Sequence, residues 1–311
     1  MPKLTILLVV LAAFAPLAAA QQTREALVEM GREPQPPAMP QREIRPPATQ
    51  PAGARIDIVD GDCKTLLFVP AGYALPADGR VNLTVHFHGA EWFVIDEHIR
   101  CGVAEPLLVV NLGQGSSVYG RAFDDPLRLR RLAGLVETRL GSNARVAQLD
   151  LTSFSAGYGA VREILKHDMY IARTRRVILC DSLYAGWDPA TTQPGATSRP
   201  SSDNMWPFER FLRLAAGGEK TFVLAHSSVP TPYANTVATA KWVAELVDAP
   251  RTDVPRNSTP ASSDKDFPLL YRADLGRLHL WGYGGEDARA HLTSVRHLAD
   301  IWRALDACGD R

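Results

Sequence analysis

Short apolar runs alternate with longer amphipathic segments along most of the chain. The apolar runs have the length of strands and are bounded by glycine, proline or polar residues. The predicted strands cover residues 64–70, 81–87, 107–112, 146–151, 176–180, 220–224 and 275–283. The predicted helices cover residues 127–140, 235–247 and 291–305. Strands that alternate with helices predict an α/β fold, with a mostly parallel central sheet and helices on both faces. Ligand sites in such sheets lie at the carboxyl ends of the strands.

Two irregular stretches interrupt this alternation. The segment Tyr184–Phe208 is rich in glycine, proline, serine and threonine. We expect a loop-rich insertion of this length to form a cap or rim over the site. Residues 250–268 are polar enough for a second surface loop.

The amino-terminal residues have the pattern of a signal peptide. Lys3 precedes an apolar run from Leu4 to Leu17, and Ala18–Ala20 offers a small-residue cleavage site. We expect residues 1–20 to be removed on export. The proline-rich residues 21–54 are then an extended tether before one domain over residues 55–311. The expected location is the periplasm or the outside of the cell, with no stable membrane insertion after cleavage. An uncleaved amino-terminal anchor is the alternative.

The charge balance limits the partners of the chain. Its 311 residues include 34 Lys plus Arg and 34 Asp plus Glu, which gives a net charge of zero, and no basic run is present. Nucleic acid and anionic membranes are therefore not expected as partners.

The chain has four cysteines, at positions 63, 101, 180 and 308. An oxidising compartment permits disulfides, and the sequence leaves all three full pairings open. We expect a Cys63–Cys101 disulfide, because both residues flank predicted strands near the start of the domain. Cys180 lies inside an apolar run and is expected to be a buried thiol.

One turn has the pattern of a nucleophile elbow, a sharp strand-to-helix turn that exposes a serine. A predicted strand ends at Leu151, and mostly small residues surround Ser155 after it. The elbow is crowded, so the residues two before and two after the serine must be small. Here these residues are Ser153 and Gly157, and the usual G-x-S-x-G reads S-x-S-x-G. The alternative is an ordinary turn with a helix-capping serine.

A second motif closes an earlier strand. The sequence His86-Phe87-His88-Gly89-Ala90-Glu91-Trp92 resembles the oxyanion loop of α/β-hydrolases. The elbow follows it, and a histidine follows the last strand. With these three signals in this order, the chain from about Lys64 onward resembles an α/β-hydrolase-fold serine hydrolase of the esterase type.

This resemblance implies a Ser–His–Asp triad and an oxyanion hole. Ser155 is then the nucleophile and His291 the base, while the backbone N–H groups of Ala90 and Ala156 receive the oxyanion. The rival bases are His279 and His297.

The position of the triad acid departs from the commonest family pattern. Most of the family place it after the second strand beyond the elbow, but no carboxylate directly follows the strand 220–224. Some members place it one strand earlier, where Asp181 follows the strand 176–180. Asp181 is therefore the expected acid, and Asp287 is its competitor.

Other side chains near these motifs are expected to contact the substrate. They are His88, Trp92, Tyr158 and His226. Alternatively, His86, His88 and His226 bind zinc, although no cysteine or carboxylate spacing completes such a site. No metal or other cofactor is expected.

The sequence predicts an exported carboxylesterase that acts on a small-molecule or polymer ester through an acyl-enzyme. An amidase or peptidase with the same triad is one alternative. A non-catalytic member of the fold that binds at the cell envelope is another. Labelling by a fluorophosphonate separates the enzymes from the binding protein, because only an activated serine reacts.

Overall fold

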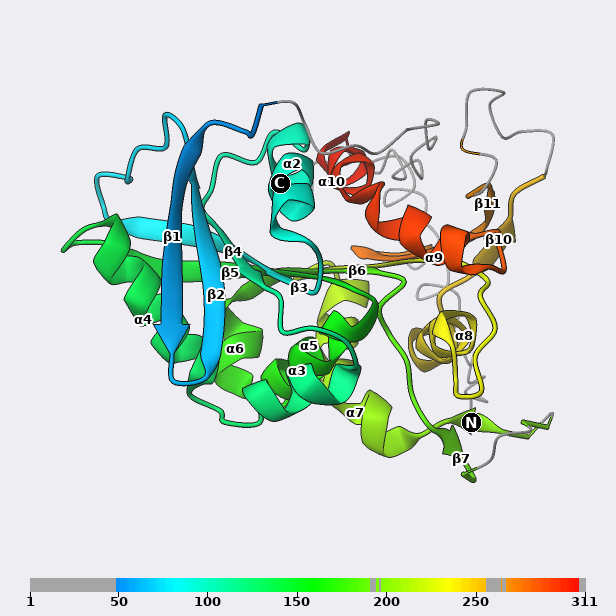
Figure 1. Cartoon of the computed structure of the whole chain (residues 1–311). Coiled ribbons are helices and arrows are strands. Elements are labelled where there is room, and N and C mark those ends of the chain that lie inside the picture. The colour runs from blue at the N-terminus through cyan, green and yellow to red at the C-terminus, as the bar shows by residue number, and fades with distance from the viewer. Residues whose placement is uncertain (1–48, 191–193, 196, 256–263, 265–266, 308–311) are drawn as a thin grey trace, which may run out of the picture.

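Figure 1 shows a wide sheet with helices on both sides of it. The computed structural model describes residues 49–190, 194–195, 197–255, 264 and 267–307. The expected signal peptide, residues 1–20, and most of the expected tether, residues 21–54, lie outside the described residues. The first strand begins at Gly53, just before the domain boundary expected at Arg55.

Ten strands of the described residues form one sheet, in the order β1-β2-β4-β3-β5-β6-β9-β12-β11-β10. The strands from β4 to β12 in this order run parallel, and antiparallel strands extend the sheet at both ends. The predicted α/β fold with a mostly parallel sheet is confirmed. In sheet order the strands are Gly53–Asp60 (β1), Cys63–Pro70 (β2), Leu107–Val110 (β4), Arg80–Phe87 (β3), Arg145–Phe154 (β5), Thr174–Cys180 (β6), Thr221–His226 (β9), Leu278–Tyr283 (β12), Leu269–Leu275 (β11) and Arg251–Asp253 (β10).

The helices cover both faces of this sheet. One face packs against α3, α4, α5, α6, α7 and α8, and the other against α2, α9 and α10. Their bounds are Glu91–Arg100 (α2), Ser116–Phe123 (α3), Arg128–Leu140 (α4), Tyr158–Leu165 (α5), Asp168–Arg173 (α6), Ser202–Ala216 (α7), Thr236–Val247 (α8), Ala288–Val295 (α9) and Leu298–Ala307 (α10). Because the central strands are covered on both faces, they are continuous apolar runs, as in β6, where residues 177–180 are fully buried.

Two predicted elements differ in the structure. The predicted strand 275–283 corresponds to β12, which begins at Leu278, and only its first residue, Leu275, belongs to β11, the preceding strand that was not predicted. Gly276 turns the chain between them at φ +58°, where a Cβ atom would lie 2.3 Å from the carbonyl oxygen of Ala216. The predicted helix 291–305 is divided into α9 and α10. The backbone N–H groups of Arg296 and His297 bond to carbonyls three residues back, and this tighter turn closes α9.

The insertion expected over residues 184–208 is partly regular. Trp187–Asp188 (β7) and Arg199–Pro200 (β8) form a small antiparallel hairpin, and α7 begins at Ser202. Residues 191–193 and 196, within this insertion, lie outside the described part of the chain. The start of α7 was not predicted from the sequence.

The structure does not join Cys63 to Cys101, contrary to the expected disulfide. Cys63 packs into the cluster on the face of α4, whereas Cys101 packs into the cluster on the face of α2 and α10. The two thiols therefore lie on different sides of the sheet. Cys180 is a fully buried thiol, and its burial raises its pKa. Cys308 is outside the described residues.

Within the described residues, no helix combines the length and the apolar character that crossing a membrane requires.

Candidate active site

Ser155 lies on a strained turn at the carboxyl end of β5. The strand ends at Phe154, a short 3₁₀ turn covers Ser155–Gly157, and α5 starts at Tyr158. Ser155 has φ +46°, a left-handed conformation that is uncommon for residues with a Cβ atom. A Cβ atom on Gly157 would lie 2.2 Å from the carbonyl oxygen of Phe87, so this position admits only glycine. The turn therefore has the geometry of a nucleophile elbow.

Ser153, the residue that departs from the usual elbow pattern, connects the elbow to the next strand. Its hydroxyl is fully buried and lies 2.7 Å from Ser182 Oγ. Ser182 Oγ donates to the carbonyl oxygen of Ser155 at 2.8 Å. The Ser153 hydroxyl must therefore donate to Ser182, and this chain of hydroxyls holds the elbow against the loop after β6.

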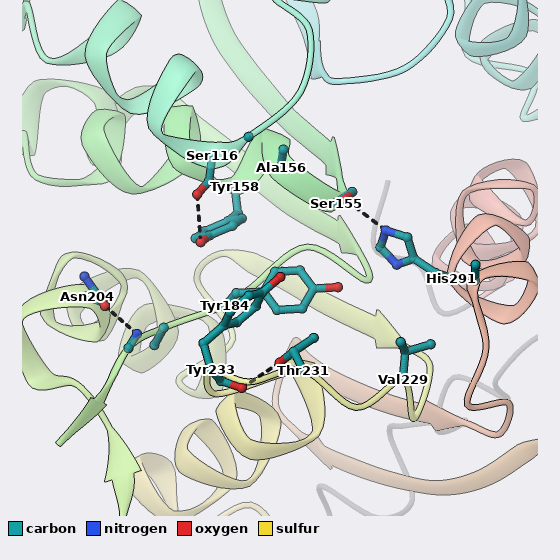
Figure 2. Close-up of a pocket in the computed structure, with 14 residues that line it drawn as sticks. Ser116, Ser155, Ala156, Tyr158, Tyr184, Asn204, Val229, Thr231, Tyr233 and His291 are labelled. Atoms are coloured by element: carbon teal, nitrogen blue, oxygen red, sulfur yellow. Dashed lines mark hydrogen bonds between the residues drawn. The ribbon is translucent and has the colours of Figure 1, made fainter. Parts of the chain in front are cut away.

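Three side chains from distant parts of the sequence form a hydrogen-bonded row at the carboxyl ends of the central strands. His291 Nε2 lies 2.9 Å from Ser155 Oγ, and His291 Nδ1 lies 2.8 Å from Asp181 Oδ2. Figure 2 shows the bond between Ser155 and His291. A carboxylate accepts from Nδ1–H, so Nε2 is left to accept the serine proton. This is the arrangement of a Ser–His–Asp triad.

Asp181 is held by more donors than His291 alone. Ser227 donates to it through its backbone N–H at 3.2 Å and through its hydroxyl, and the Thr236 hydroxyl donates at 2.6 Å. Burial by itself raises the pKa of Asp181, but the bonds from His291, Ser227 and Thr236 outweigh it and lower the pKa below its ordinary value. The carboxyl group therefore stays ionised beside His291.

Replacing Thr236 by valine is expected to destabilise the protein by about 1.5–3 kcal/mol at pH 7, because it removes a hydrogen bond to a buried carboxylate. The folded-state pKa of Asp181 is depressed, so the stability from its bonds is present above the ordinary carboxyl pKa. It is lost as the pH falls through the folded-state value. The difference between wild type and Thr236→Val should therefore shrink in acid. Urea unfolding at neutral and acidic pH measures it.

The matched control for this variant is Thr239→Val, on the same helix. The buried Thr239 hydroxyl donates to the neutral carbonyl of Leu183 at 2.7 Å. Its loss should cost the same at both pH values. If the two variants show the same pH dependence, Thr236 does not act through the charge of Asp181.

The rival triad residues are engaged elsewhere. The carboxyl group of Asp287 accepts from the backbone N–H of Ala290 at 2.9 Å and so caps α9. His279 pairs with Asp274 at 2.8 Å, and His297 pairs with Asp300 at 2.8 Å. Both imidazoles are buried within the protein, away from Ser155 Oγ.

The three histidines of the zinc alternative each bond to protein partners. His86 Nε2 donates to the carbonyl of His88 at 3.0 Å, which leaves Nδ1 to accept from Thr152 Oγ1 at 2.8 Å. His226 Nδ1 donates to the carbonyl of Ser227 at 2.8 Å, and its Nε2 accepts from Tyr271 at 2.7 Å. Burial lowers the pKa of His86 to about 4, so this imidazole is neutral at pH 7. In the residues that the structure describes, no group of three His, Cys, Asp or Glu is placed to hold a metal ion.

The loop between β3 and α2 is held by these histidines. His88 has φ +71°, and its Nδ1 lies 2.9 Å from Tyr119 OH. Its carbonyl accepts from His86, and its ring stacks on Phe154 with 5.7 Å between centroids. The bonds to His86 and Tyr119 fix a backbone that would otherwise be unfavourable for a non-glycine residue.

A cavity of about 610 Å³ opens beside Ser155. This volume lies within the range of pockets for small organic ligands. The described residues that line it are Gly115, Ser116, Ser155, Ala156, Tyr158, Tyr184, Ala185, Gly186, Asn204, Val229, Thr231, Tyr233, Ala288 and His291, and Figure 2 shows how they surround it.

Only some of the predicted site residues line this cavity. Ala156 and Tyr158 do, and so do four residues of the insertion expected to shape it. His88 and Trp92 do not belong to the lining. His226 is almost completely buried, with both ring nitrogens bonded, so its expected contact with substrate is wrong.

Ala90, the other expected oxyanion donor, is the amino-terminal cap of α2. Its carbonyl accepts from Phe93 and Val94, and it is not among the residues that line the cavity. Its part in an oxyanion hole stays a prediction.

Two groups of lining residues were not predicted from the sequence: Gly115 and Ser116 after β4, and Val229, Thr231 and Tyr233 after β9. Both groups follow the carboxyl ends of strands in a parallel sheet, where ligand sites lie, and this position could have indicated them.

Several solved structures of hydrolases have a similar chain path. A poly(3-hydroxybutyrate) depolymerase from Bordetella parapertussis is 16% identical, with a TM-score of 0.46, over 81% of this chain and 89% of its own. A thermostable esterase from Pseudomonas putida is 11% identical, with a TM-score of 0.45, over 95% and 88%. A carboxylesterase cloned from a metagenomic library is 12% identical, with a TM-score of 0.44, over 96% and 99%.

No family model matches the chain, and no curated protein sequence is similar to it. Likenesses as distant as those to the solved structures carry no weight for activity or substrate. The strand order, the elbow after β5, the loop after β3 and the order Ser155, Asp181, His291 define the α/β-hydrolase fold. The predicted resemblance is therefore supported at the level of the fold alone.

Proposed function

We propose that the protein is a serine hydrolase that cleaves a carboxylic ester through an acyl-enzyme on Ser155. The observation that carries this proposal is the hydrogen-bonded row Ser155–His291–Asp181 at the mouth of a cavity. A serine hydroxyl becomes nucleophilic when a positioned base takes its proton. The oriented imidazole and the ionised carboxylate supply this function together.

In the proposed reaction, Ser155 Oγ attacks the ester carbonyl carbon while its proton passes to His291 Nε2. The backbone N–H of Ala156 stabilises the resulting oxyanion. When the tetrahedral intermediate collapses, the C–O bond to the alcohol breaks, and the alcohol leaves with the proton from His291. Water then gives a proton to His291 and attacks the acyl-enzyme, which releases the carboxylic acid and returns the proton to Ser155.

Fluorophosphonate labelling tests this proposal. The wild-type protein is expected to be labelled on Ser155, as read from the modified peptide by mass spectrometry. It should also hydrolyse p-nitrophenyl esters faster than p-nitroanilides with the same acyl group. Rapid cleavage of the anilides alone would favour an amidase. Absence of label on a folded protein would favour a binding function for the same fold.

Export also belongs to this proposal. It is supported by Lys3, by the apolar run Leu4–Leu17 and by Ala18–Ala20. The expected amino terminus of the exported protein is Gln21, which amino-terminal sequencing checks. A mature chain that still begins at Met1 would contradict cleavage.

A further inference from the structure

The described residues that line the cavity are almost all uncharged side chains, and His291 is the basic residue among them. Among the described lining residues there is no Asp, Glu, Lys or Arg. A charged substrate group would lose its water on entering and find no counter-charge, which is costly. The described lining therefore favours an uncharged substrate group.

Three tyrosines form a continuous aromatic wall in this cavity. The ring centroid of Tyr184 lies 5.6 Å from that of Tyr158 and 5.6 Å from that of Tyr233. These separations are typical of favourable aromatic pairs. Tyr158 and Tyr184 are buried, whereas Tyr233 is 46% exposed. A further ring in the cavity can extend the cluster onto the open surface of Tyr233.

The same wall offers hydrogen-bonding groups that the described protein does not use. The hydroxyls of Tyr184 and Tyr233 make no hydrogen bond within the described residues, and burial raises the pKa of each, so both are neutral donors. Tyr158 donates to Ser116 Oγ at 3.1 Å, which leaves the Ser116 hydrogen available. Asn204 accepts from the N–H of Gly186 at 2.8 Å, which leaves its amide N–H₂ available. These groups suit a ring with a hydroxyl or ether substituent.

The tyrosines lie on the acyl side of the proposed reaction. The alcohol must receive its proton from His291 Nε2, so it leaves on the His291 side of Ser155. Figure 2 shows His291 on one side of Ser155, and the tyrosines and Asn204 on the other. The described lining also includes Gly115, Ala185 and Gly186, whose small size leaves width for a flat group.

From these observations we infer that the acyl group of the substrate is an uncharged aromatic ring with a hydrogen-bonding substituent. The products are then a substituted aryl-alkanoic acid and an alcohol. This inference rests on the proposed ester hydrolysis. It adds the class of the acyl group, which the triad does not determine.

The test compares kcat/KM for methyl esters of matched acids, with the released acid measured by chromatography. The acyl groups are 3-(4-hydroxyphenyl)propanoyl, 3-phenylpropanoyl, 3-cyclohexylpropanoyl, nonanoyl and 3-(4-carboxyphenyl)propanoyl. The 3-cyclohexylpropanoyl group matches the 3-phenylpropanoyl group in size but has no aromatic ring. We expect kcat/KM to be roughly five- to tenfold higher for the 3-phenylpropanoyl than for the 3-cyclohexylpropanoyl substrate. The hydroxyphenyl substrate should have the highest kcat/KM and the carboxyphenyl substrate the lowest.

Two variants of Tyr233 and one control test whether the tyrosine wall causes the preference for aryl acyl groups. Tyr233→Ala should reduce kcat/KM for the aryl esters by roughly tenfold and for the nonanoyl ester by a smaller factor. Tyr233→Phe should remove only part of the advantage of the hydroxyphenyl over the phenyl ester. Trp206→Ala, an equally exposed aromatic residue on α7 that does not line the cavity, should change no ratio.

The possible failures of the two proposals are distinguishable. Equal rates for phenyl and cyclohexyl esters, or a preference for the nonanoyl or carboxyphenyl ester, would overturn the aryl inference while ester hydrolysis stands. The Ser155→Ala variant also allows a binding measurement without turnover. It should bind neutral 3-(4-hydroxyphenyl)propanamide more tightly than 3-cyclohexylpropanamide by calorimetry. If the variant binds in this order but Ser155 of the wild-type protein is never labelled, the proposed hydrolase activity is overturned and the aryl site is retained. Tighter binding of 3-cyclohexylpropanamide would overturn the aryl site.

Discussion

Replacing Ser155 by alanine is expected to lower kcat for ester hydrolysis by about a millionfold, the scale on which a triad nucleophile contributes. The Ser155 hydroxyl is the group that His291 Nε2 contacts at 2.9 Å, and alanine leaves the base without a partner. The fold should be retained, because Ser155 Oγ makes no other side-chain bond within the described residues. Hydrolysis of a p-nitrophenyl ester and thermal unfolding measure the two effects.

Ser153→Ala is the matched control, two residues away on the same elbow. The Ser153 hydroxyl is buried and bonded to Ser182, so its loss should cost about 1–3 kcal/mol of stability while most of the activity remains. If Ser153→Ala removes activity and Ser155→Ala does not, the elbow has been assigned in the wrong register.

Asp181→Asn is expected to lower kcat by roughly ten-thousandfold, by analogy with other triad aspartates. An asparagine amide facing Nδ1 favours the wrong tautomer of His291, and it removes the charge that stabilises the imidazolium. The Ser227 and Thr236 donors then face an amide in place of a carboxylate, so unfolding must be measured beside activity.

The control for this second variant is Asp287→Asn. Asp287 caps α9 through the Ala290 N–H, and asparagine caps helices equally well. Both activity and stability should therefore change little. The opposite ranking of the two variants would move the acid to the loop before α9.

Local patterns in the sequence were sufficient to predict the parallel strands at the centre of the sheet. Strands such as β6 and β9 are buried on both faces, so their sequences contain unbroken apolar runs. The strands β1 and β10 were missed because the edge of a sheet requires less burial: all three residues of β10 are exposed, and the burial pattern of β1 is irregular. The division of the predicted helix 291–305 depends on two backbone hydrogen bonds, which an apolar stripe does not reveal.

In the candidate site, too, some residues could be predicted from their position after strands, and others depend on packing. Ser155, Asp181 and His291 were predicted to meet because each follows a strand, and neighbouring parallel strands bring their carboxyl ends to the same side of the sheet. The role of His226 was misjudged because a histidine at a strand end can point into the protein, as His226 does toward Tyr271. The tyrosine wall depends on how the loops after β6 and β9 meet, which is a property of packing and not of spacing. The Cys63–Cys101 pairing failed for a related reason, since proximity in sequence to the domain's start says nothing about which face of the sheet a residue occupies.

The three residues of the triad are joined by contacts that span most of the domain. His291 meets Asp181 across 110 residues of sequence and Ser155 across 136. Contacts of such long range form late, after the intervening chain has closed into the sheet. While the chain is being synthesised, the nucleophile and its acid therefore leave the ribosome long before the base. A nascent chain that stops before α9 should be unreactive toward fluorophosphonate even though the elbow is already complete. Labelling of Ser155 thus reports the docking of the carboxyl-terminal helices, and can time that step during synthesis and folding.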